Sequence, residues 1–300
     1  MEAREVAYLF LLVVAPPASF YAKAYGSQSA AVVESVSGIV RAGPPGGPVR
    51  GVNSLDWLAP GEALEVAAKS SVTLVLLNGS RYRLGGAARA TVTAGSLQGV
   101  RGPVELLSKL PPLPSIASIA GGVARASGAV RFRNPSKIGS FYPREGVVVL
   151  PDLARLSFST VARASIYQVD LIDEDENSLL RRRTVNGSVE VPPGVLRPGS
   201  RYSWRVRALG DIGVIAEAGA AFSTIGETEL QARANFADML RQVAGGAAAL
   251  AVLGEIDFQL GLIEEARREF QAALELQPGD LQYRSALQRV EAALRGAPQK

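Results

Sequence analysis

The strongest constraint on the fold lies in residues 247–280, where two helical segments meet at Gly261 and end at Pro278-Gly279. Glycine permits a tight turn, and proline cannot continue a helix because it lacks the backbone N–H that an interior turn needs. Asp280 then offers a side-chain cap for another helix. The pattern predicts four helices, over residues 228–243, 247–260, 263–276 and 280–295.

This hairpin resembles a tetratricopeptide (TPR) repeat, a unit of about 34 residues. The positions that such a repeat uses are occupied by Leu253, Gly254, Gly261, Ala266, Phe270, Ala273 and Pro278. Leu250 and Asp257 stand where aromatic residues are common in the family, and Phe258 is expected to take over the contact made at Asp257. The resemblance implies a protein-binding surface without chemistry of its own, formed by Leu253, Gly254, Phe258, Ala266, Phe270 and Ala273.

Only one repeat is well formed, whereas repeat arrays usually need about three units to bury a continuous core. We therefore expect the helical tail, residues 227–296, to dock on the rest of the chain, to form a homodimer or to bind another protein. A plain two-hairpin bundle is the alternative.

The 300 residues include no histidine and no cysteine. This composition excludes disulfides, thiol nucleophiles, His-based catalytic triads and the usual zinc and haem ligands, and we expect no cofactor. Carboxylate chemistry stays open, with Asp152, Asp170 and Glu190 as the acidic residues that a carbohydrate-active enzyme could use. None of the three lies in a recognisable motif, so we expect a protein that is not an enzyme.

Charge is distributed unevenly along the chain. Residues 25–226 carry 22 Lys and Arg against 15 Asp and Glu, whereas residues 227–300 carry 8 against 11. A basic body favours anionic partners such as an envelope polymer, although ordinary solubility charge is the simpler interpretation of an excess of this size. No basic run with interleaved aromatic residues is present, so we expect no nucleic-acid partner.

Residues 1–24 are typical of a secretory signal peptide. The apolar run Val6–Ala15 is followed by a small-residue cleavage pattern at residues 22–24. The run is shorter than the roughly 20 apolar residues that span a membrane. We therefore expect cleavage and export to the periplasm or cell envelope, and an uncleaved N-terminal anchor is the alternative.

Residues 30–108 alternate in the manner of β-strands separated by glycine turns. Asn78-Gly79 and Asn186-Gly187 each begin a glycosylation sequon, but Asn-Gly is also the strongest hairpin-turn dipeptide, and we interpret both as hairpin turns. Short strands at this spacing predict a sandwich or β-roll. The predicted strands are Ala31–Val40, Ala63–Ala67, Val72–Leu77 and Arg81–Leu84.

This region resembles the FecR-like domain of bacterial envelope proteins, through residues 36–40, 58–64 and 70–80. Asn78 stands where the family usually has Asp, a change that a hairpin turn tolerates. The resemblance implies an exported β domain that contacts another protein or an envelope polymer. The signalling member of the family carries a cytosolic segment ahead of a transmembrane helix. Only five residues precede the apolar run here, so we do not expect the sigma-factor role to carry over.

Residues 109–140 are expected to form a Pro- and Gly-rich linker between the β modules. The linker begins with the stiff stretch Leu110–Pro114 and includes one alternating segment, Arg131–Arg133, which is a further strand candidate.

Residues 141–225 predict a second β module. Two of its segments, 164–171 and 196–206, resemble a fibronectin type III-like sandwich, including the tyrosine corner in which the Tyr202 hydroxyl bonds to the upstream backbone. Phe158 stands where such domains usually place Trp. The segment Leu196–Ala208 is the clearest predicted strand. Its alternation places Tyr202 and Trp204 on the core face, so we interpret them as core residues rather than as a sugar-stacking platform. The side chains that share its inward face are Tyr202, Trp204, Val206 and Ala208.

The acidic stretch Asp173–Asn177 matches the first three ligands of an EF-hand loop, but Ser178 and Thr184 stand where that loop needs Gly and Glu. We therefore interpret the stretch as a solvated hairpin tip and expect no metal site. Arg181–Arg183 on the return strand could pair with this tip or form a small anion patch.

Together these features predict a multidomain, mainly β protein with an all-α tail, exported and without catalytic chemistry. We expect an envelope adaptor in which the β modules contact an envelope polymer or protein and the TPR-like tail contacts a protein partner. The alternative is the receptor-side component of a trans-envelope signalling relay, anchored by an uncleaved N-terminus.

Overall fold

The computed structural model describes residues 29–114, 138–153, 155–211, 213–244 and 246–295. Within these residues the chain forms several mostly antiparallel β-sheets followed by four helices, which confirms the predicted multidomain, mainly β architecture with a helical tail. The signal peptide predicted at residues 1–24 and the strand candidate Arg131–Arg133 lie outside the described residues.

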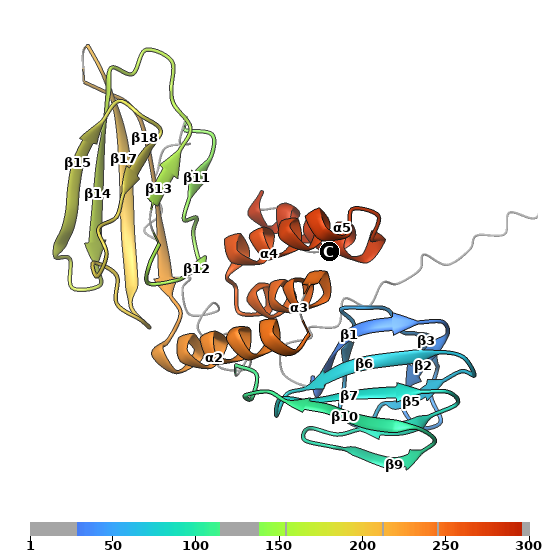
Figure 1. The fold of residues 1–300 in the computed structure, drawn as a ribbon. Coiled ribbons are helices and arrows are strands. Elements are labelled where there is room, and N and C mark those ends of the chain that lie inside the picture. Colours follow the sequence, from blue (N-terminus) through green and yellow to red (C-terminus); the bar gives the residue numbers. More distant parts are fainter. Residues whose placement is uncertain (1–28, 115–137, 154, 212, 245, 296–300) are drawn as a thin grey trace, which may run out of the picture.

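The first β module consists of two five-stranded sheets that share one apolar core (Figure 1). Leu64, Leu74 and Leu84 are among the side chains that fill it, because alternate residues of a strand point to the same face. One sheet has the order β10 (Val104–Lys109), β7 (Ser80–Gly85), β6 (Ser71–Leu76), β1 (Ala31–Ser37) and β4 (Trp57–Leu58). The other has the order β3 (Arg50–Gly51), β2 (Val40–Gly43), β5 (Ala63–Val66), β8 (Arg89–Val92) and β9 (Leu97–Arg101).

The prediction of one strand over Ala31–Val40 is wrong, because the chain leaves the first sheet at Gly38 and enters the second. Gly38 has a φ of 81°, and a Cβ there would lie 2.4 Å from Ser70 Oγ, which accepts the Ile39 N–H at 2.9 Å. The hairpin predicted at Asn78-Gly79 is confirmed between β6 and β7.

The second β module is a sandwich of a three-stranded and a five-stranded sheet around its own apolar core. Trp204 is 2% exposed in this core and donates its indole N–H to the Pro143 carbonyl at 2.8 Å. The Tyr202 hydroxyl accepts the Arg197 N–H at 2.6 Å, which confirms the tyrosine corner. The smaller sheet has the order β11 (Phe141–Tyr142), β13 (Arg155–Phe158) and β16 (Ser188–Glu190). The larger has the order β12 (Val148–Val149), β18 (Gly213–Thr224), β17 (Arg201–Gly210), β14 (Ile166–Asp173) and β15 (Ser178–Thr184).

The hairpin predicted at Asn186-Gly187 is wrong. β15 and β16 belong to different sheets, so this dipeptide lies where the chain crosses from the larger sheet to the smaller one. An added Cβ on Gly187 would lie 2.6 Å from the Phe158 carbonyl oxygen. A close approach of two backbones therefore explains this glycine, and a hairpin turn does not.

The four helices of the described residues begin and end within one residue of the predicted positions. Asp280 caps the last of them, its Oδ1 accepting the N–H groups of Gln282 at 2.8 Å and Tyr283 at 3.0 Å. Gly261, with a φ of 76°, makes the turn inside the hairpin. The helices are α2 (Glu227–Val243), α3 (Gly246–Gln259), α4 (Ile263–Leu276) and α5 (Leu281–Leu294).

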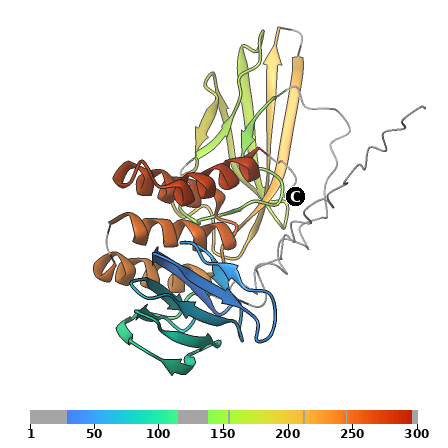
Figure 2. The same cartoon turned by 90° about the vertical axis from the view of Figure 1, so that its right-hand side faces the viewer.

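The helical unit, α2 to α5, lies between the two β modules in both views (Figure 1 and Figure 2). One apolar cluster joins Val32, Trp57 and Val75 of the first module to the helices and reaches Val148 of the second. β1 and β6 are therefore buried on both faces, one in the core of their own module and one against the helical unit. The structure thus shows the helical tail docked on the chain's own β modules. Among the described helices, none combines the length and the apolar character that a membrane span requires.

Candidate functional site

The residues predicted to bind a protein partner build the interior of the α3–α4 hairpin. Four of their side chains are at most 1% exposed, those of Leu253, Ala266, Phe270 and Ala273. Gly254 lies against the Phe270 ring, since an added Cβ would be 3.2 Å from three ring atoms. Phe258 is half-buried, and the Arg289 guanidinium lies 4.9 Å from the centroid of its ring. A partner cannot reach the buried side chains without opening the hairpin.

The face of α3 that meets the first β module carries a fully buried carboxylate, Glu255. This group accepts the indole N–H of Trp57 at 2.9 Å, the side-chain amide of Gln259 at 3.0 Å and a hydrogen bond from the Arg289 guanidinium. Loss of any one of these donors would leave the buried negative charge of Glu255 with fewer hydrogen bonds to stabilise it. The sequence holds one signal for this interface: the almost continuously apolar run Val72–Leu77 is typical of a strand buried on both faces.

A second buried ion pair joins α2 to α3. The Asp257 side chain is 1% exposed and accepts two hydrogen bonds of 2.5 Å from the Arg233 guanidinium. A bidentate pair of this kind fixes the relative position of two helices. Asp257 therefore contributes to the internal packing of the helical unit.

The outer face of the larger sandwich sheet carries two rows of arginine, on β15 and β17, with β14 between them. Across the strands, Asp170 of β14 stands between Arg181 and Arg205, and Gln168 stands between Arg183 and Arg207. Neighbouring strands are about 4.8 Å apart, so arginines on β15 and β17 stand ~10 Å apart across β14. These arginines are Arg181 and Arg183 on β15 and Arg205 and Arg207 on β17.

Three of these arginines line a groove of about 270 Å³, here called the arginine groove, together with Asp170. Asp170 accepts hydrogen bonds from Arg181 Nε at 2.7 Å and Arg207 Nη2 at 2.8 Å. Burial opposes ionisation of Asp170, but the hydrogen bonds from Arg207 and Arg181 outweigh it and hold the pKa of this carboxyl below its ordinary value. Arg205 pairs with Glu217 at 3.1 Å.

Arg207 retains unused hydrogen-bonding capacity in the arginine groove. Its Nε is shielded from solvent and has no hydrogen-bond partner among the residues that the structure describes. A buried donor of this kind costs free energy unless an acceptor reaches it. The groove is therefore suited to a ligand that brings an additional acceptor, and above all a charged one.

The acidic hairpin tip satisfies its own backbone. Asp173 Oδ1 accepts the N–H groups of Asp175 at 3.0 Å and Asn177 at 2.8 Å, which closes the turn between β14 and β15. The predicted hairpin is confirmed. Arg181 pairs with Asp170 on the neighbouring strand, so the alternative in which the arginines pair with the tip is wrong for this residue.

The three carboxylates considered for carbohydrate chemistry lie in separate places. Asp170 lines the arginine groove, whereas Glu190 is exposed on β16 of the other sheet. Asp152 lines a different pocket of about 270 Å³, beside Glu265 and Glu269 of α4. The low pKa of Asp170 does not suit a general acid near neutral pH. The three residues therefore do not form one catalytic pair.

No protein-family model matches the chain, and no curated protein matches it. Similar solved structures include CopC from Methylosinus trichosporium OB3b, at 16% identity and a TM-score of 0.25, covering 31% of this chain and 96% of that one. The FN1–FN3 domains of chicken CNTN1 match at 13% identity and a TM-score of 0.21, covering 66% of this chain and 56% of that one. The second module is a β-sandwich because its two sheets enclose one apolar core.

Proposed function

We propose that this chain is a non-enzymatic, exported envelope protein whose second β module binds an anionic envelope polymer. The observation that carries the proposal is the arginine groove, where Arg207 keeps a buried N–H without an acceptor in the described part of the chain. A ligand oxygen would satisfy that donor once the side chains that shield it move aside, whereas the Arg181 guanidinium, on a side chain 69% exposed, is directly accessible. Carboxylate and phosphate groups fit the planar guanidinium fork best, so the ligand is an anion.

The two rows of arginine favour a chain of anions over a single ion. Outward-facing residues two apart on one strand are about 7 Å apart, so the four guanidinium groups share one face of the sheet. On that face four arginines stand against two carboxylates, those of Asp170 and Glu217. Anionic groups that repeat along a polymer engage several arginines at once, which strengthens attachment beyond that of one contact. Because the surface is solvent-exposed, binding should weaken as salt is added.

The resemblances to FecR-like, fibronectin type III-like and TPR-like modules belong to the same proposal. In this proposal the helical unit holds the two β modules. The arginine groove lies on the larger sandwich sheet, whose strands β14 and β15 are on the side away from the helices (Figure 1). A protein contact through the tail would use Leu276 and Leu281, which are 58% and 71% exposed at the α4–α5 turn. A homodimer formed through the same turn is the competing outcome.

The test is equilibrium binding of the full chain to a labelled polyuronate, with polyphosphate and neutral dextran as comparison probes. Arg181→Gln combined with Arg207→Gln should weaken polyuronate binding at least tenfold at low salt, because hydrogen bonds to charged groups contribute about 1.5–3 kcal/mol. Arg89→Gln, which changes an exposed arginine paired with Glu65 in the first module, is the matched control. Equal loss in both variants, or equal binding of dextran, would overturn the proposal.

A further inference from the structure

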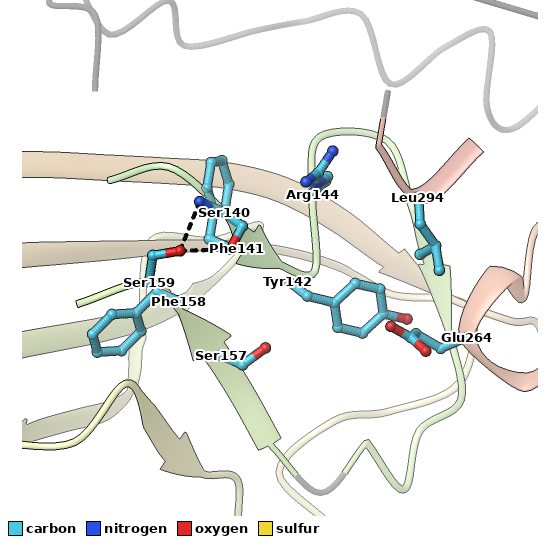
Figure 3. A pocket seen from close by; sticks show the side chains of 9 residues that line it. All are labelled: Ser140, Phe141, Tyr142, Arg144, Ser157, Phe158, Ser159, Glu264 and Leu294. Atoms are coloured by element: carbon cyan, nitrogen blue, oxygen red, sulfur yellow. Dashed lines mark hydrogen bonds between the residues drawn. The ribbon is translucent and has the colours of Figure 1, made fainter. Parts of the chain in front are cut away.

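A second pocket lies on the opposite side of the sandwich, between its smaller sheet and the helical unit (Figure 3). Its volume is about 310 Å³, within the range of small-molecule sites. Tyr142 of β11 and Ser157 of β13 are directly paired, and both line the pocket. Glu264 of α4 and Leu294 of α5 line it from the helical side. This junction pocket therefore exists only when the helical unit is docked.

The Tyr142 hydroxyl is the most informative group in the junction pocket. Its oxygen is shielded from solvent and has no hydrogen-bond partner among the described residues. In Figure 3 it faces the Glu264 carboxylate, which accepts a hydrogen bond from Arg267 at 2.8 Å. Burial, together with the nearby Glu265 and Glu264 carboxylates, raises the pKa of Tyr142 above its ordinary value, so the phenol stays protonated and can donate.

An orphan hydroxyl at this position points to a ligand. A shielded O–H without an acceptor costs folding free energy, and phenylalanine would fill the same space without that cost. Residues that lower stability in this way are expected at binding sites, where the missing partner arrives with the ligand. Tyr142 therefore fits a binding role better than a packing role.

The remaining polar groups of the junction pocket are serine hydroxyls and one pair of opposite charges. Ser140 and Ser159 share a hydrogen bond of 2.6 Å between their hydroxyl oxygens, and Ser157 adds a third serine. Arg144 and Glu264 contribute one charge of each sign to the lining. Hydroxyl groups both donate and accept, so they match a ligand whose own groups do the same.

We propose that the junction pocket binds one unit of a neutral saccharide. A sugar ring offers hydroxyls to Ser157 and Glu264, and to the Tyr142 hydroxyl once the side chains that shield it from solvent move aside. Its apolar face packs on the tyrosine ring and Leu294. An anion would meet the Glu264 carboxylate as well as Arg144, so the lining gives it no net attraction, and an apolar ligand would leave the hydroxyls without partners. The inference is independent of the arginine groove, which lies on the other sheet of the sandwich.

The test is isothermal titration of the full chain with glucose, N-acetylglucosamine, cellobiose and chitobiose. At least one should bind saturably, and Tyr142→Phe should weaken that binding about three- to tenfold, the effect of one lost hydrogen bond. Tyr82→Phe, the same change in the first β module, should leave the affinity unaltered. Because the Tyr142 hydroxyl has no partner without ligand, Tyr142→Phe should melt at or above the temperature of the unchanged chain.

A second variant, Ser157→Val, places two methyl groups in the pocket at a strand position that favours β-branched residues, and should abolish saturable binding. The proposal is overturned if none of the four sugars binds the unchanged chain, or if Tyr142→Phe binds as the unchanged chain does. A Tyr142→Phe protein that melts clearly lower would assign the hydroxyl a structural role and would overturn it as well.

Discussion

Trp57→Phe tests whether the helical unit is held by a specific polar contact as well as by apolar packing. Trp57 is 5% exposed, and its indole N–H is a donor to the fully buried Glu255. Phenylalanine keeps one aromatic ring but removes that donor and leaves a void. The lost hydrogen bond to a charged acceptor costs about 1.5–3 kcal/mol, and the void adds about 1 kcal/mol. We expect a total loss of about 3 kcal/mol, a large part of the 5–15 kcal/mol of an ordinary domain.

Urea unfolding with two probes measures this loss. Far-ultraviolet circular dichroism follows the helices, whereas Trp204, the tryptophan that remains, reports on the sandwich core. The midpoint of the helical transition should fall by about 1–2 M urea, and the Trp204 transition should move less. Glu255→Gln provides the partner for a double-mutant cycle, and the combined variant should lose less than the sum of the single losses. An unchanged helical midpoint in Trp57→Phe, or strict additivity, would refute the reasoning.

Two further predictions concern a buried carboxyl and a turn. Burial raises the pKa of Glu265, so the stability that its protonated form provides is present below about pH 4 and lost as the pH rises through the folded-state pKa. Glu265→Gln should therefore raise the melting temperature of the helical unit near pH 7 and not near pH 4, and a lower melting temperature near pH 7 would contradict this. Gly79→Ala should lower the free energy of unfolding of the first β module by about 2 kcal/mol or more, because Gly79 has a φ of 83° and an added Cβ would lie 2.0 Å from the Leu110 carbonyl oxygen. Urea unfolding measures this loss against Gly85→Ala, where a new Cβ meets open space, and equal losses in the two variants would argue against it.

Short-range signals predicted the features that depend on residues close together in the chain. The cap at Asp280 needs only the two or three residues after it, and the helix ends follow from it and from the neighbouring Pro278. Alternation along β17 placed Tyr202, Trp204 and Val206 in the core and Arg205 and Arg207 outside. The part of the arginine groove on β17 was therefore predictable as an exposed basic face.

Long-range pairing decided what those signals left open. Asn78-Gly79 and Asn186-Gly187 are the same dipeptide, but the second joins strands of different sheets, because strand partners depend on which strands share a core. The arginine groove requires the register that pairs Asp170 with Arg181 on β15 and with Arg205 on β17, and that leaves Arg207 within hydrogen-bond reach of Asp170. The spacing of residues within one segment of the sequence does not determine that register.

The amino-acid sequence by itself determined the helix ends, the inward faces of strands, two hairpins and the exclusion of His and Cys chemistry. Each of these depends on residue type or on neighbours a few positions away. Only the tertiary structure decided that the repeat residues face each other inside the helical unit, and that α3 docks on the first β module through Trp57 and Glu255, 198 residues apart. A buried carboxylate needs hydrogen-bond donors, and the donors to Glu255 come within reach only when the chain folds.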